Sequence, residues 1–367
     1  MLPWLGERHS NPSSIHTRGA AAAKALEEAR RQVAVMVGAT PGQVVFTSGA
    51  TEANNHAVRG AARLARRDGR VFLGVAAHEH PSLLHPARSL ARCGFDLQAI
   101  AVGREGFVEP DGLPIEELGV LGLSFAHAEL GALQPVRQIT DAARGGGARV
   151  VVDATLAAGR IGVVMANLGE PDLLTLSFHH FGGPMGVGAV VIGKGQDLSP
   201  MIEGGVQEDG RRPGSPKLAG CVGAGVAAAV ARKNLASRSA NLAILGDILY
   251  DGLKGAEAVI LTGPPPERRL PGHLSLSIGG VEGESLVRGL ELRGVLAATG
   301  SPCAEQAGLA SEALRAAGYS REEARGALVL CVPPTASISR SDARRATGEI
   351  LAEIERLRAV GGTGAAS

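Results

Sequence analysis

Lysine and aromatic side chains are scarce in this chain of 367 residues. Phe, Trp and Tyr make up 3% of it, and lysine supplies only five of its 37 basic residues. With 36 acidic residues the formal net charge is +1, which argues against a nucleic-acid surface or a polybasic membrane patch. The five lysines are Lys24, Lys194, Lys217, Lys233 and Lys254.

Cysteine is also sparse and shows no metal-ligand spacing. The four cysteines form no C-x-x-C pair and no zinc pattern. We recognise no signal peptide, and glycine or charge interrupts every apolar run well short of a membrane span. These features predict a cytoplasmic protein with reduced thiols. The cysteines are Cys93, Cys221, Cys303 and Cys331.

Short apolar runs alternate with helical patterns over the first two thirds of the chain. Continuous apolar runs are typical of parallel strands buried on both faces, so this part is predicted to be an α/β domain, residues 1–235. The pattern becomes irregular afterwards and predicts a smaller α+β domain, residues 236–367. The strands expected in the large domain are 43–47, 70–75, 96–101, 120–124, 149–153, 173–177 and 187–192.

Polar side chains follow five of these predicted strands. Thr47–Glu52 leads into a helix, His78–His80 and Phe125–Glu129 contain histidines, Asp153 ends a strand, and Ser177–His180 ends another. In an open α/β sheet, ligands bind beyond the carboxyl ends of the strands. A helix N-terminus with small residues and hydroxyls also favours an anion. The sequence therefore predicts a ligand site at this edge.

Four motifs occur in a specific order along the chain: Asn11–His16, Phe46–Asn55, Phe181–Ala189 and Val281–Ser285. Together they resemble cysteine desulfurases, a group within the class V aminotransferases of the fold-type I pyridoxal-phosphate enzymes. The resemblance covers almost the whole chain. It implies a large domain with a mostly parallel seven-stranded sheet, a smaller C-terminal domain, bound pyridoxal phosphate, and a homodimer with active sites at the subunit interface.

The resemblance assigns roles to several residues at the strand ends. Ala50 and Thr51 match the turn that binds the cofactor phosphate. His80 matches the histidine that stacks on the pyridine ring. Asp153 matches the carboxylate that pairs with the ring nitrogen and keeps it protonated, so that the ring acts as an electron sink.

Further positions match the periphery of the family's site. Ser177 and His179 match neighbours of the phosphate and the ring. Ser215 matches a hydroxyl that reaches the phosphate of the other subunit. Cys303 matches the loop cysteine that accepts sulfur as a persulfide.

Other positions depart from the family pattern around the amino-acid substrate. His180 stands where the family has the lysine that forms the Schiff base with the cofactor, and imidazole cannot form that stable imine. Ala128 replaces an asparagine near the ring, and Leu156 replaces a glutamine. Val329 replaces the arginine that binds the substrate carboxylate. The family's N-terminal segment, rich in Asp, Asn and Thr, has no counterpart here.

These departures favour a desulfurase homologue that is impaired in normal turnover. It would bind pyridoxal phosphate non-covalently and act as a scaffold, bind a sulfur acceptor, or form the inactive half of a heterodimer with an active desulfurase. Ser215 would then complete the partner's site.

Two alternatives remain open at this point. In the first, the protein is an active enzyme in which His180, with an unperturbed pKa of ~6.5, is the base and Cys303 accepts sulfur, or in which Lys217 or Lys194 replaces the missing lysine. In the second, His127, His179, His180 and Cys303 bind a metal or an iron–sulfur cluster.

Overall fold

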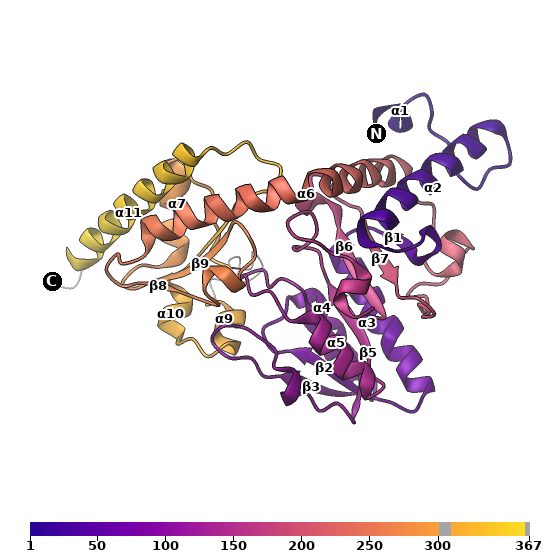
Figure 1. Ribbon diagram of the computed structural model, residues 1–367, viewed down its shortest axis with the longest axis horizontal. Helices are drawn as coiled ribbons and strands as arrows, with labels where there is room; N and C mark the ends of the chain where they lie inside the picture. Colours follow the sequence, from indigo (N-terminus) through magenta and orange to yellow (C-terminus); the bar gives the residue numbers. More distant parts are fainter. Residues whose placement is uncertain (301–309, 364–367) are drawn as a thin grey trace. The chain divides into compact units, whose positions relative to one another are not determined.

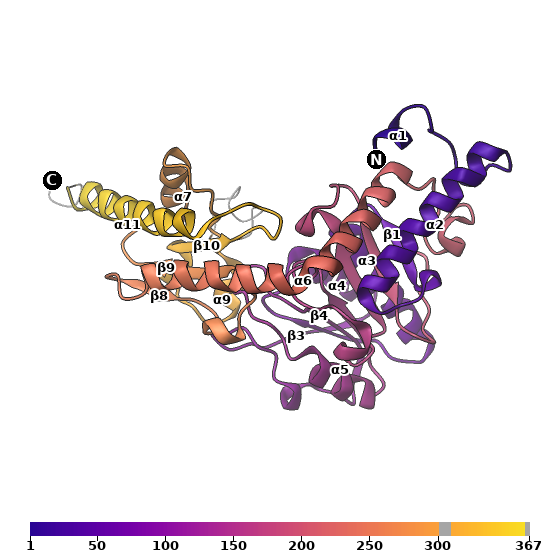
Figure 2. The same ribbon diagram turned by 45° about the horizontal axis from the view of Figure 1, so that its top comes forward.

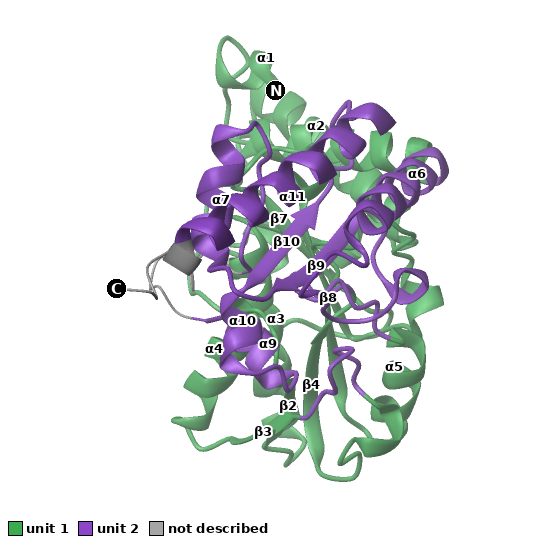
Figure 3. Ribbon diagram, turned by 90° about the vertical axis from the view of Figure 1, so that its left-hand side faces the viewer, with its two compact units in different colours: residues 1–100, 109–125, 135–235 green, residues 101–108, 126–134, 236–367 purple. Residues whose placement is uncertain are grey.

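The computed structural model describes residues 1–300 and 310–363, and these divide into two compact units, coloured separately in Figure 3. Two short segments between strands of the first unit belong to the second unit. Unit 1 comprises residues 1–100, 109–125 and 135–235, and unit 2 comprises residues 101–108, 126–134 and 236–367.

A seven-stranded sheet forms the centre of unit 1 (Figure 1). The strand order is β1-β7-β6-β5-β4-β2-β3, and β7 runs antiparallel to both of its neighbours while the other pairs are parallel. The strands are β1 (Val44–Thr47), β2 (Phe72–Ala76), β3 (Asp96–Ile100), β4 (Leu118–Ser124), β5 (Arg149–Asp153), β6 (Leu173–Ser177) and β7 (Gly188–Ile192).

Helix α3 (Ala50–Arg67) carries much of the apolar surface that covers this sheet. Its buried alanines and Val58 pack with Leu83 and Leu90 of the neighbouring helix α4 and with strand residues such as Val151. Alanine favours the helix and permits close approach to the strands. The other helices of unit 1 are α1 (Leu2–Leu5), α2 (Thr17–Val37), α4 (Pro81–Ala91) and α5 (Val136–Gly145).

Unit 2 is built on a three-stranded antiparallel sheet of order β10-β9-β8 (Figure 2). Leucines of the second half of α6 pack with β9, β10, α7 and α11 in one apolar core. Helix α6 (Leu218–Leu253) begins in unit 1 and ends in unit 2. The remaining elements are β8 (Val259–Leu261), β9 (His273–Ile278), α7 (Gly283–Leu292), α9 (Glu312–Ala316), α10 (Arg321–Arg325), β10 (Ala327–Cys331) and α11 (Arg340–Thr363).

The predicted fold class is confirmed: an α/β unit with a mostly parallel seven-stranded sheet and a smaller α+β unit. All seven predicted strands of the large sheet overlap the observed ones. Strand β8 was missed because three residues carry too little alternation to identify a strand. In the described ranges, no helix is both long and apolar enough to cross a bilayer.

Candidate functional site

The carboxyl ends of β1, β2, β4, β5 and β6 lie at one edge of the sheet in unit 1, because these strands share a direction (Figure 1). Strand β7 begins at this edge and ends at the opposite one. Asp153 is the last residue of β5, and the turn into α3 and the side chains of His80, His179 and His180 follow the ends of β1, β2 and β6.

The N-terminus of α3 is a candidate anion site at this edge. Ala50 and Thr51 are its first two residues, and Gly49 before them has φ 145° and provides no side-chain cap. The first N–H groups of a helix have no partner within the helix, and the helix dipole adds positive potential there. A Cβ on Gly188 would lie 2.6 Å from the carbonyl carbon of Gly49, so glycine is required for β7 to approach the turn.

Glu52, in the first turn of α3, is neutralised by Arg212. Arg212 donates from Nε to one carboxylate oxygen at 2.7 Å and from Nη2 to the other at 3.2 Å. Burial acts to raise the pKa of Glu52, but the hydrogen bonds from Arg212 and from the Ser48 N–H outweigh it and lower that pKa. The ion pair removes the repulsion that a lone carboxylate would exert on a bound phosphate.

Asp153 is held by a buried network that begins on α3. The Nδ2 group of Asn54 donates to Asp153 Oδ2 at 2.7 Å and to Ser82 Oγ at 2.8 Å. The Thr175 hydroxyl donates to Asn54 Oδ1 at 2.5 Å, and the Thr155 N–H donates to Asp153 Oδ1 at 2.8 Å. Both carboxylate oxygens are therefore fixed in position.

The same network reaches His80 and determines its tautomer. The Ser82 N–H donates to His80 Nδ1 at 3.1 Å, and the Ser82 hydroxyl lies 2.8 Å from the same nitrogen. Because Nδ1 accepts, the proton of the neutral ring resides on Nε2. Desolvation lowers the pKa of His80 despite the nearby carboxylate of Asp153, which favours this neutral form. The ring orientation is thus coupled to Asp153 through Ser82 and Asn54.

His180 is the most strongly perturbed histidine at the edge. Its ring centroid lies 4.2 Å from that of His179, whose Nδ1 is 2.9 Å from the buried Ser177 hydroxyl. Burial, with smaller effects from His179, Arg160 and His80, lowers the pKa of His180 to about 4. An unperturbed histidine has a pKa of ~6.5, so His180 is a much weaker base than its residue type indicates.

Glu79 belongs to the same edge, within the predicted stretch His78–His80, but the sequence assigned it no role of its own. The Ser124 N–H and hydroxyl donate to its Oε1 at 2.6 and 2.9 Å, and its Oε2 is buried with no hydrogen-bond partner among the described residues. Burial raises the pKa of Glu79 to about 7, to which Asp153 contributes. Asn54, Ser82 and Thr175 were likewise missed, since nothing in their sequence spacing links them.

The remaining predicted site residues are Ser215, His127 and Cys303. Ser215 is exposed on the segment before α6. His127 belongs to unit 2, where its Nδ1 accepts the N–H groups of Glu129 and Leu130 at 3.3 and 3.0 Å and so stabilises a turn. Cys303 lies outside the described residues. Within the ranges that are described, no group of three or more His, Cys, Asp or Glu could hold a metal.

Three further positions were singled out for their departure from the family pattern. Leu156 lies in unit 1, whereas Ala128 and Val329 lie in unit 2. Val329 is a buried residue of β10 that pairs with Ser275 of β9, and Ala128 accepts a hydrogen bond from His273 Nε2 through its carbonyl at 2.8 Å. None of these three side chains can form an ion pair with a substrate carboxylate.

The residues at the edge fit pyridoxal phosphate in part. The N-terminus of α3 suits the phosphate, the fixed carboxylate of Asp153 suits a protonated ring nitrogen, and His80 provides a ring beside them. Covalent attachment does not fit, because the sequence has no lysine between Lys24 and Lys194 and therefore none on any strand of the sheet or the loops that join them.

Among the lysines of unit 1, Lys217 lies near this edge. Its Nζ lies 2.8 Å from the position that a Cβ on Gly186 would occupy, just before β7 begins. Lys194 follows the far end of β7, since that strand runs antiparallel to β6. The direction of β7 therefore disfavours Lys194 as a replacement for the missing lysine.

Comparison with known proteins identifies the family. The aminotransferase class-V model matches residues 2–321. Cysteine desulfurase IscS 1 of Archaeoglobus fulgidus is 37% identical over 333 residues, covering 90% of this chain and 86% of that protein. Cysteine desulfurase IscS of Dictyoglomus turgidum is 35% identical over 331 residues, covering 89% of this chain and 84% of that protein.

Two solved structures agree with this assignment. A NifS-like protein superposes with a TM-score of 0.85 at 27% identity, covering 99% of this chain and 94% of that chain. DndA from Streptomyces lividans superposes with a TM-score of 0.76 at 28% identity, covering 90% of this chain and 94% of that chain. The chain belongs to the class-V aminotransferase family and is cysteine desulfurase-like within it.

Proposed function

We propose that this protein is a cysteine desulfurase homologue impaired in normal desulfuration, which binds pyridoxal phosphate or a related phosphate ligand without a covalent link. It serves as a scaffold or as the inactive subunit beside an active desulfurase, in sulfur or iron–sulfur metabolism. A cytoplasmic location accords with this role. When bound, the cofactor would supply an electron sink, and Asp153, His80 and the N-terminus of α3 would hold it.

One observation carries the proposal: the stretch that follows β6 offers His180 and no lysine. A side chain must carry a primary amine to join a carbonyl carbon as a stable imine. His180 cannot substitute as an efficient proton carrier either, because its pKa of about 4 is far from neutrality. The intact network around Asp153, by contrast, supports retained binding.

The proposed role as a partner subunit rests on a residue that this chain retains, Ser215, and not on the missing lysine. The exposed Ser215 is positioned by a turn whose Arg212 pairs with Glu52 beside the phosphate site. By resemblance, a hydroxyl at this position serves the cofactor phosphate of a second subunit. A subunit with no reaction of its own would still supply that hydroxyl to an active partner.

Sulfide release from L-cysteine tests the proposal. With pyridoxal phosphate and a thiol reductant present, the protein should release no more sulfide than free cofactor does, and Cys303→Ser should not change this. Release that depends on Cys303 would show that the enzyme is active.

The single variant His180→Lys sharpens the test. It should restore covalent attachment of the cofactor but not desulfuration, because Val329 cannot bind the substrate carboxylate. Robust sulfide release from this variant would show that the histidine alone accounts for the loss.

A further inference from the structure

We propose that unit 2 contains a binding pocket for a small carboxylate, centred on Arg238 of α6. The pocket has a volume of about 270 Å³ and lies between α6 and the segment that follows β10. All of its lining residues belong to unit 2, whereas the residues of the candidate cofactor site belong to unit 1. Its lining residues are Ser237, Arg238, Asn241, Leu242 and Val332–Ala336.

The guanidinium group of Arg238 is the reason to expect an anion. Its Nη1 is buried, and no described residue accepts a hydrogen bond from it. No described carboxylate forms an ion pair with Arg238, and the nine lining residues include neither aspartate nor glutamate. A buried donor on a charged group is costly to leave unsatisfied, so an oxyanion in the pocket would remove that cost.

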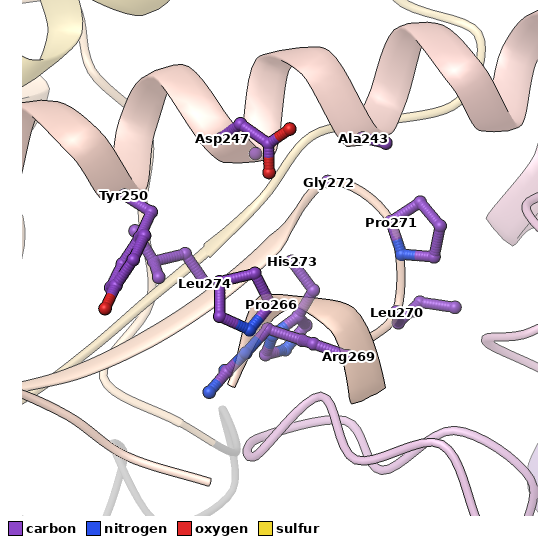
Figure 4. A pocket seen from close by; sticks show the side chains of 11 residues that line it. Ala243, Asp247, Tyr250, Pro266, Arg269, Leu270, Pro271, Gly272, His273 and Leu274 are labelled. Carbon is purple, nitrogen blue, oxygen red and sulfur yellow. The ribbon is translucent and has the colours of Figure 1, made fainter. Parts of the chain in front are cut away.

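A second pocket of unit 2 shows what a satisfied arginine looks like (Figure 4). Arg269 is buried there, near α6 residues Asp247 and Tyr250, in a pocket of about 70 Å³. Its guanidinium donates to the carbonyl oxygens of Leu130, Thr262 and Pro264. Arg269 thus needs no external acceptor, and the contrast singles out Arg238.

The walls of the Arg238 pocket indicate which oxyanion fits. A planar guanidinium binds carboxylates and phosphates through paired N–H groups. The lining is mostly polar: Asn241 and Thr335 offer an amide and a hydroxyl beside Arg238. Leu242 and Val332 are almost fully buried, so Pro333 and Pro334 supply the smaller apolar surface. The pocket is larger than a single oxyanion requires. A small carboxylate with an aliphatic group uses both the cation and the apolar surface of the two prolines.

The test compares isovalerate, acetate and inorganic phosphate as probes, by calorimetric titration of the full-length protein at constant ionic strength. Isovalerate should bind at one site, more tightly than acetate. Arg238→Gln should weaken isovalerate binding roughly tenfold or more, because a charge-assisted hydrogen bond is lost. Arg232→Gln, an exposed arginine of the same helix that does not line the pocket, should leave binding unchanged.

A second variant distinguishes a loss of binding from a loss of folding. Asn241→Asp places a carboxylate in the pocket, three residues from Arg238 on the same helix, so it should abolish isovalerate binding while raising the melting temperature. Three results would overturn the proposal: no isovalerate binding by the unaltered protein, equal binding by Arg238→Gln, or binding of phosphate without isovalerate.

Discussion

The low pKa of His180 makes a quantitative prediction about how stability depends on pH. The folded-state value is about 4, against 6.5 for an unperturbed histidine. Between these values the unfolded chain binds more protons than the folded one, so stability is complete above pH 6.5 and falls as the pH decreases. The full difference corresponds to about 3 kcal/mol, of which about 2 kcal/mol is lost by pH 5.

Replacing His180 by Asn removes this titration. Between pH 8 and pH 5, the free energy of unfolding of the original protein should fall by about 2 kcal/mol more than that of His180→Asn. Urea unfolding at both pH values measures the difference. Met185→Leu, an exposed and uncharged change in the same loop, should keep the pH dependence of the original protein.

Histidine NMR provides the direct check, with the His180→Asn spectrum assigning the resonance. A His180 signal that titrates near pH 6.5, or identical pH dependence in the two proteins, would refute the reasoning. Such a result would mean that water or a ligand reaches the ring and that the burial argument for its neutrality fails.

Three further predictions follow from the same edge of the sheet. Glu79→Gln should match the original protein in stability at pH 4 and exceed it at pH 8 by up to about 3 kcal/mol, because the raised pKa of about 7 makes the ionised carboxylate costly. Equal stabilities at pH 8 would contradict this. Asn54→Ala should cost about 1–3 kcal/mol and weaken pyridoxal phosphate binding, whereas Asn55→Ala, which loses only a bond to the Thr51 carbonyl, should do neither. Equal losses in the two variants would exclude the network as the cause. Gly188→Ala should cost about 1–3 kcal/mol, since its Cβ would meet the Gly49 carbonyl carbon at 2.6 Å; a melting temperature unchanged from the original would show that the turn can shift freely.

The sheet could be predicted because its strands are buried on both faces and read as apolar runs. Leu173–Ser177 and Arg149–Asp153 were placed to the residue. The parallel direction of most strands also followed from the alternating helices. The reversed direction of β7 could not be predicted, because a buried strand has the same apolar sequence pattern whether it pairs parallel or antiparallel. That reversal is what carries Lys194 away from the site.

Residues of the candidate site could be predicted only where a titratable side chain lies at or shortly after the end of a strand. Asp153 is the last residue of a strand and His80 lies in the loop after another, and both were found. Asn54 lies inside a helix, and its bond to Asp153 spans 99 residues, so the network that fixes the carboxylate depends on the folded arrangement. Burial also decides pKa values, which is why the perturbation of His180 and Glu79 could not be anticipated from residue type.

Borohydride reduction of the protein incubated with pyridoxal phosphate tests the central claim most directly. The cofactor should bind, be removed by dialysis, and leave no covalent adduct in the mass spectrum after reduction. Asp153→Asn should abolish the reversible binding. An adduct on a lysine, with Lys217 the first candidate and Lys217→Ala the check, would contradict the claim and identify a working covalent site.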